Sequence, residues 1–313
     1  MNNNRGAQGL LLENNSAPLP TGLRGYFLWN EGSDVTVIGN TVANSTREHV
    51  IRMANSQRVL VAYNTFTNLD RTAVDRDDRA KGCIVVQNQT SYVYVAHNYV
   101  KDGGIGVGPL GIAGATVQYP SEKQARSRWV VVDSNTLEHA TLVAEHGAEE
   151  VVFRNNVIRN DNGVCIVVKP YSAEYDRQVL NLQIVNNTGI NQSADGQFLR
   201  VDGKAQGLVL ANNLYVAPNL VTGNGAAVVY VTGSDLSSFQ RISNNVWPIP
   251  KTTGYAEGGY HYLWPNWSDP KGYQTPQEWG ANAPVQHEMY LNVQLQDGYQ
   301  VSVDGITAGA NLN

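Results

Sequence analysis

The chain is 313 residues long with a net charge of -5, and 42% of its residues are hydrophobic while only 16% are charged. This composition excludes a disordered chain, and the length allows a sizeable core. No apolar run approaches the roughly 18 residues of a membrane helix, so no membrane span is expected. The 22 lysines and arginines are spread along the chain, which argues against a nucleic-acid partner because phosphate tracking needs clustered positive charge.

The amino terminus and the cysteines bear on the compartment. Residues 1–4 lack the basic segment and hydrophobic stretch of a signal peptide. We expect a secreted or periplasmic protein from which such a peptide has been removed. The chain has only two cysteines, Cys83 and Cys165, which excludes a dense disulfide framework.

A short apolar strand that ends in asparagine recurs along most of the chain. The spacing of these asparagines varies from 21 residues (Asn135 to Asn156) to 37 residues (Asn98 to Asn135). Constant strands with variable loops are typical of a solenoid, in which each coil contacts only its neighbours. One asparagine at the same corner of every coil can form an amide ladder. The predicted ladder positions are Asn40, Asn64, Asn98, Asn135, Asn156, Asn187, Asn213 and Asn245.

A second strand precedes each ladder strand, and a third, shorter strand follows the asparagine. The preceding strands lie at 26–30, 49–54, 83–87, 141–146, 164–169, 198–203 and 228–233. The pattern resembles the right-handed, single-stranded parallel β-helix of the pectate-lyase-like superfamily, an all-β solenoid, over roughly residues 5–248. We take residues 1–248 as the β-helix. Residues 249–313, rich in proline, glycine and aromatics, are taken as an irregular C-terminal cap packed on the solenoid.

The two cysteines provide a test of this register. Cys83 and Cys165 occupy the same strand column three coils apart, hence about 14 Å at the usual strand spacing. That distance exceeds the roughly 7 Å limit between the α-carbons of a disulfide. We therefore predict that both thiols are free and buried.

Outward positions of the preceding strands carry charged and aromatic side chains. Arg52, Lys169 and Arg200 each interrupt an apolar run whose flanking residues should point inward. Aligning the strands in one register predicts a single outer column of Trp29, Arg52, Gln87, Glu145, Lys169, Arg200 and Tyr230. Three cations in one column suggest a groove for an acidic polysaccharide, with Trp29, Arg52, Gln87 and Tyr230 as binding residues. Ion pairing with acids such as Glu145 or Asp202 is the alternative for each cation.

Lys169 and Arg200 carry the sharper prediction because they lie on consecutive coils. Removing the proton next to a uronate carboxylate requires a base and a group that neutralises the carboxylate. Like charge and desolvation make a lysine beside an arginine easier to deprotonate, and an arginine can hold a carboxylate with two hydrogen bonds. We expect Lys169 as the base and Arg200 as the neutralising group or acid.

The segments ending in Lys169 (VCIVVK) and containing Arg200 (FLRVDG) resemble the β-helical polysaccharide lyases that include chondroitinase B and related alginate lyases. The resemblance covers residues 160–205 and implies β-elimination on an acidic glycan. Glu145 on the preceding coil and His146 at its strand end are taken as further catalytic residues, with His146 as an auxiliary acid or base. Calcium is the cofactor that the family would use, but the sequence matches its acidic ligands only at Glu145, so no cofactor is certain and no metal ligand is assigned.

Other functions are compatible with the same residues. The same lysine and arginine would serve an epimerase. Asp75, Asp77 or Glu145 would serve an inverting glycosidase, which needs separated carboxylates. A β-helix that binds glycans without catalysis would use Trp29 and Tyr230. His139 and His146 flank a strand but match no metal spacing, and residues 102–115 are expected to form a corner loop rather than a phosphate loop. The oligomeric state is left open.

Overall fold

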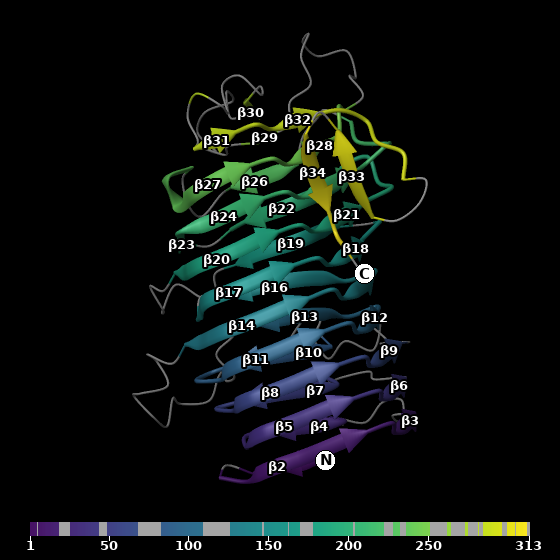
Figure 1. Ribbon diagram of the computed structural model, residues 1–313, viewed down its shortest axis with the longest axis vertical. Coiled ribbons are helices and arrows are strands. Elements are labelled where there is room, and N and C mark those ends of the chain that lie inside the picture. Colours follow the sequence, from purple (N-terminus) through teal and green to yellow (C-terminus); the bar gives the residue numbers. More distant parts are fainter. Residues whose placement is uncertain are drawn as a thin grey trace, which may run out of the picture.

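The chain winds into a parallel β-helix whose coils stack from the amino-terminal to the carboxyl-terminal end (Figure 1). This computed structural model describes residues 1–4, 6–18, 26–43, 49–67, 83–108, 126–145, 147–161, 163–169, 178–202, 204–221, 228–231, 236–250, 262–263, 273–274, 281, 284–295, 299–303 and 305–311. Each coil contributes one strand to each of three sheets, here called A, B and C. The predicted fold class is therefore confirmed.

Sheet A contains the strands that precede the ladder strands. Its members are β1 (Asn2–Asn3), β4 (Leu28–Asn30), β7 (Ile51–Ala54), β10 (Ile84–Gln87), β13 (Gly104–Val107), β16 (Thr141–Glu145), β19 (Val164–Lys169), β22 (Gln197–Val201), β26 (Val229–Val231), β29 (Tyr262–Leu263) and β30 (Tyr273–Gln274). The described pairs are parallel except that between β29 and β30.

Sheet B contains the ladder strands, and sheet C contains the short strands that follow them. Sheet B comprises β2 (Gln8–Glu13), β5 (Ser33–Ile38), β8 (Gln57–Ala62), β11 (Ser91–Ala96), β14 (Ser127–Asp133), β17 (Ala148–Arg154), β20 (Val179–Val185), β23 (Ala205–Gln206), β24 (Leu208–Ala211), β27 (Phe239–Ser243) and β31 (Val285–Gln286). A short 3-10 helix, Leu236–Ser238, precedes β27. Sheet C comprises β3 (Ser16–Pro18), β6 (Thr41–Ala43), β9 (Thr65–Thr67), β12 (Tyr99–Lys101), β15 (Thr136–Glu138), β18 (Val157–Arg159), β21 (Thr188–Ile190), β25 (Leu214–Val216), β28 (Val246–Trp247) and β32 (Met289–Tyr290).

The turn from sheet B to sheet C holds the asparagine ladder. Asn135 shows its chemistry: the backbone N–H and Nδ2 both donate to Oδ1 of Asn156 at 3.0 Å, and Nδ2 also donates to the carbonyls of Val95 and Asp133. Buried polar groups need such partners, so the ladder satisfies the turn backbone as well as itself. Side-chain bonds of the same kind join the eight predicted asparagines, from Asn40 to Asn245. Asn15 adds a member at the amino-terminal end.

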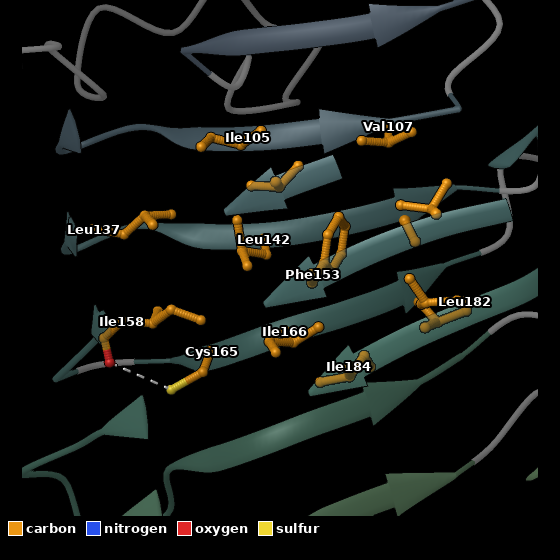
Figure 2. Packing of buried hydrophobic residues seen from close by; sticks show 14 of the residues in the cluster. Ile105, Val107, Leu137, Leu142, Phe153, Ile158, Cys165, Ile166, Leu182 and Ile184 are labelled. Atoms are coloured by element: carbon orange, nitrogen blue, oxygen red, sulfur yellow. Dashed lines mark hydrogen bonds between the residues drawn. The ribbon is translucent and has the colours of Figure 1, made fainter. Parts of the chain in front are cut away.

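The interior is filled by inward side chains that repeat from coil to coil. Ile105, Leu142 and Ile166 come from consecutive sheet A strands and are fully buried. They face residues of the other two sheets, including Leu137 and Phe153, across one continuous core (Figure 2). Cys165 lies in this core with its Sγ 3.9 Å from the carbonyl of Ile158. Cys83 and Cys165 are both free and buried, as predicted.

One coil differs from the sequence-based expectation. Gly104–Val107 forms strand β13 of sheet A, paired with both β10 and β16, so the interpretation of this part of 102–115 as a loop is wrong. Its two glycines weaken the apolar pattern by which the other sheet A strands were recognised. Gly104 is needed here because an added Cβ would lie 2.7 Å from the carbonyl oxygen of Thr141. Residues 109–115 lie outside the described part.

The C-terminal segment continues the coils and then folds back. Strands β31 and β32 extend sheets B and C beyond Pro248. The hairpin of β33 (Gln300–Val303) and β34 (Ile306–Gly309) lies beside sheet C (Figure 1). A second hydrophobic cluster joins Ala308 of the hairpin to Leu214 and Val246 of sheet C. The backbone N–H of Gly309 donates to the Asn212 carbonyl at 2.8 Å, which fixes the hairpin against the solenoid.

Candidate functional site

The outer face of sheet A carries the predicted site residues, but in two rows rather than one. The first row follows the register Trp29, Arg52, Val85, Gly106, Val143, Val167, Arg200 and Tyr230. The second row lies two residues further along the strands, and it contains Gln87, Glu145 and Lys169. Period-two alternation puts both rows on the same face. The single column predicted from the sequence is therefore wrong in register, although its members share one face.

Glu145 and Lys169 are register partners on β16 and β19. The Nζ of Lys169 lies 3.9 Å from Oε1 of Glu145, a long ion pair. The lysine side chain is 42% exposed and the glutamate 13%. The Lys169 side chain is therefore partly exposed, while Glu145 is largely covered.

Arg200 is fixed by two neighbours on the same face. Its Nε donates to Oδ1 of Asp202 at 2.8 Å and lies 2.7 Å from Oδ2. Its guanidinium carbon lies 5.3 Å from the centre of the Tyr230 ring, its register partner. The Tyr230 residue is 7% exposed while the Arg200 side chain is 43% exposed. The two described contacts involve Nε, which donates to Asp202, and the guanidinium group, which lies over the Tyr230 ring. The terminal nitrogens Nη1 and Nη2 are therefore the groups best placed for a ligand.

Asp202 lies two residues after Arg200 and is adjacent to Lys169 in the strand register. Val201 pairs with Val168, so the next residues along the two strands are Asp202 and Lys169. From the sequence, Asp202 is expected only as an ion-pair partner. Its position two residues after Arg200 was the available signal, since residues two apart on a strand share a face.

Arg52 belongs to a separate cluster nearer the amino terminus. Its guanidinium lies 4.6 Å from the Trp29 ring centre, and Nη1 donates to the Tyr26 hydroxyl at 3.1 Å. With the Gln87 amide oriented so that its oxygen faces Arg52, that oxygen accepts from Nε at 2.7 Å and from Nη2 at 2.8 Å. Four coil steps separate β7 from β19, or about 19 Å at the usual strand spacing. Trp29, Arg52 and Gln87 therefore do not meet Lys169 and Arg200.

The remaining predicted residues lie elsewhere. His146, Asp75 and Asp77 fall outside the described residues. His139 lies at the corner after sheet C, with Nδ1 3.2 Å from Oδ1 of Asp102, and so is not on the sheet A face with Glu145. In the described part of the chain, no group of three or more histidine, cysteine, aspartate or glutamate side chains is arranged to hold a metal. The acid ligands expected for calcium therefore do not gather at Glu145 among these residues.

Two acids on the other sheets, Glu138 and Asp133, have structural partners among the described residues. Glu138 on β15 accepts hydrogen bonds from Lys101 and Tyr99, which hold the pKa of its carboxyl below the ordinary value. Asp133 on β14 accepts hydrogen bonds from Tyr94 and Arg154. These two acids therefore have structural partners on their own faces.

The chain was compared with protein-family models, with curated proteins and with solved structures, and none of the three comparisons gave a match. The described residues contain no helix with the length and apolarity required to cross a membrane.

Proposed function

We propose that the protein is a polysaccharide lyase that cleaves an acidic, uronate-containing glycan by β-elimination on the outer face of sheet A. One observation carries this proposal. The Arg200 guanidinium is held by Asp202 and Tyr230. It lies on the same face of sheet A as the partly exposed Lys169 side chain, on the adjacent strand. Proton abstraction next to a carboxylate requires a base and a prearranged cation, and Lys169 and Arg200 would supply them.

The reaction assigns one role to each side chain. The terminal nitrogens of Arg200 bind the uronate carboxylate and stabilise the charge that develops on it. The Lys169 amine is the base that takes the proton from the adjacent carbon; the electron pair forms a carbon–carbon double bond, and the bond to the leaving glycosidic oxygen breaks. That oxygen leaves as a hydroxyl after taking a proton from water. Asp202 and Glu145 position the two cations.

The test is incubation with alginate, pectate and glycosaminoglycans, followed through the ultraviolet absorbance of the unsaturated uronate product. Lys169→Ala is expected to lower turnover by about 100-fold to 10,000-fold, the range typical of lost general-base catalysis. Arg241→Ala, an exposed cation on sheet B, is the matched control and should retain full activity. Absence of unsaturated product with all three glycan classes, or full activity in Lys169→Ala, would refute the proposal.

A second candidate is a glycan-binding β-helix without catalysis. The observation that favours it is that each cation already has a carboxylate on its own wall, Glu145 for Lys169 and Asp202 for Arg200. In such a pair, a carboxylate of a bound glycan can replace the protein carboxylate as partner of the cation, and this needs no catalytic step. Salt-sensitive binding of an acidic glycan that Arg200→Ala weakens, with no bond cleavage, would support this candidate over the lyase.

A further inference from the structure

Sheet B contains a second feature, a column of side chains in the left-handed backbone region. At the second or third residue of each of six consecutive strands, φ lies between 52° and 57°. The neighbours of these residues pair in register from β5 to β20. We call this set the bulge column; its members are Asp34, Arg58, Tyr92, Trp129, Glu150 and Asn181.

The bulge column is organised as three pairs. Arg58 donates to Asp34 through Nε at 2.6 Å and Nη2 at 2.8 Å. Tyr92 and Trp129 stack with ring centres 4.7 Å apart and planes 21° apart. Glu150 accepts a hydrogen bond from Nδ2 of Asn181 at 2.7 Å. A cationic residue therefore lies on one side of an aromatic stack and an anionic residue on the other.

The residue types are costly at this backbone conformation. The left-handed region favours glycine and tolerates asparagine and aspartate, whereas large side chains adopt it with strain. The column is bounded by Gly9 and Gly207, which have positive φ at the corresponding places. Tyr92 and Trp129 nevertheless occupy it and remain 55% and 47% exposed. Strain combined with exposed aromatic surface indicates a binding role outside the chain.

The order of the column is self-complementary. A twofold axis parallel to the strands of sheet B, lying in front of its outer face between Tyr92 and Trp129, would set Tyr92 of one copy opposite Trp129 of the other. The same operation would set Arg58 opposite Glu150 and Asp34 opposite Asn181. Within one chain Arg58 pairs with Asp34 and Glu150 with the neutral Asn181, and Arg58 and Glu150 are three coils apart, about 14 Å. Only a second copy in this orientation brings the two charges together, as an isologous interface requires.

We propose that two copies of the chain form a twofold dimer through the bulge column of sheet B. The outward residues next along the strands, Leu60, Tyr94 and Val131, continue the apolar surface toward the middle of the sheet. Aromatic residues at the centre with charged residues around them are typical of protein interfaces. Tyr92 and Trp129 already cover one face of each other's ring, so their exposed edges suit aromatic partners better than a sugar that needs a ring face.

The test is sedimentation equilibrium of the full chain over a concentration series, with Tyr92→Asn/Trp129→Asn as the main variant. Asparagine tolerates the left-handed region, so the fold should be retained. We expect the dimer dissociation constant to rise at least 30-fold. The matched control is Tyr63→Asn/His97→Asn, which removes another exposed stack with positive φ on both residues. Tyr63 and His97 belong to the row of positive-φ residues that precede the ladder asparagines, and their neighbours in that row are Gly39 and Ser134. Because these neighbours carry no charge, the control should leave dimerisation unchanged.

Charge reversal tests the twofold orientation itself. Arg58→Glu and Glu150→Arg are each expected to weaken the dimer, and the double variant should recover most of the affinity. Thermal unfolding of all variants checks that folding is intact. A monomeric wild type at all concentrations, equal weakening by the control pair, or a double variant no better than the singles would overturn the proposal. Binding of an uncharged glycan to a monomer, lost in Tyr92→Asn/Trp129→Asn, would assign the surface to glycan instead.

Discussion

Nδ2 of Asn245 donates to Oε1 of Glu288 at 2.9 Å, so a glutamate continues the asparagine ladder at its carboxyl-terminal end. The residue before it, His287, has a positive φ of 52°, and the residues before the ladder asparagines also have positive φ. The same carboxylate oxygen accepts from Nε1 of the buried Trp247 at 3.0 Å. The ladder therefore ends on a side chain that accepts from the last asparagine and from a core aromatic.

Asn135→Ala should be among the most destabilising single changes in the solenoid. It removes the acceptor for the backbone N–H and Nδ2 of Asn98, and it removes the donor to the carbonyls of Val95 and Asp133. Buried groups left without partners cost about 1–3 kcal/mol each, so we expect a loss of about 3–5 kcal/mol in the free energy of unfolding. Chemical denaturation of both proteins measures the difference.

The control for the ladder variant is Asn186→Gly. Asn186 precedes a ladder asparagine and has φ of 55°, a conformation that glycine adopts freely. A change within about 1 kcal/mol is expected. If Asn135→Ala costs no more than this control, the ladder does not contribute to stability in the way inferred.

Gly189→Ala is predicted to overpack the core. A Cβ at this position would lie 2.7 Å from the Phe198 ring and 3.0 Å from the Tyr215 ring. Both rings are buried, and Phe198 also packs against Trp247 at 5.3 Å between centres. Extra volume in a close-packed core costs about 1–3 kcal/mol. Thermal or chemical unfolding should show this loss.

Gly106→Ala is the matched control for that prediction. Gly106 lies on the outer face of sheet A, where an added Cβ would only touch Val85 at 4.0 Å. Its unfolding midpoint should equal or exceed that of the wild type, because alanine restricts the unfolded chain. Equal losses in the two variants would contradict the steric explanation.

Asp133 is predicted to make the protein less stable in acid. Burial alone would raise the pKa of this carboxyl, but hydrogen bonds from Tyr94, Arg154, Asn155 and Ser134 outweigh it and hold the pKa below the ordinary value. An acid whose pKa is lowered in the folded state contributes stability above its unfolded pKa of about 3.9. That contribution is lost as the pH falls through the lower, folded value.

Asp133→Asn isolates the contribution of this carboxylate. At neutral pH the variant should lose about 1.5–3 kcal/mol, the value of hydrogen bonds to a charged group. In strong acid the wild type and the variant should converge in stability, since both then carry a neutral side chain. Denaturation at neutral pH and near pH 3 measures the difference twice. A gap that is the same at both values would show that Asp133 does not titrate as described.

The architecture was predictable because it repeats. Eight asparagines at variable spacing were enough to predict the ladder, because each side chain must hydrogen-bond the asparagine of the next coil. The register of Cys83 and Cys165 followed from that, and both thiols are free and buried as expected. Strand β13 was missed because two glycines in four residues weaken the apolar pattern while leaving the backbone able to pair.

The candidate site was less predictable because it depends on a shift of two residues. Lys169 is the last residue of β19, whereas Arg200 is followed by Val201 within β22. Turn hydrogen bonds determine where each strand ends, and the order of apolar residues does not reveal those ends. The sequence therefore predicts the two cations in one row. The bulge column left no signal at all, since its members share a backbone conformation and no residue type.

The two thiols provide a test of whether the solenoid opens. Burial raises the pKa of Cys165 to about 12 and that of Cys83 well above the ordinary value. Because the thiolate is the reactive form, neither should react with a thiol reagent at pH 8 while the chain is folded, and both should react in denaturant. Thr307→Cys, on the exposed hairpin, is the control and should add one thiol that reacts at once. Rapid labelling of Cys165 in the native protein would mean that the core around β19 opens far more often than its burial indicates.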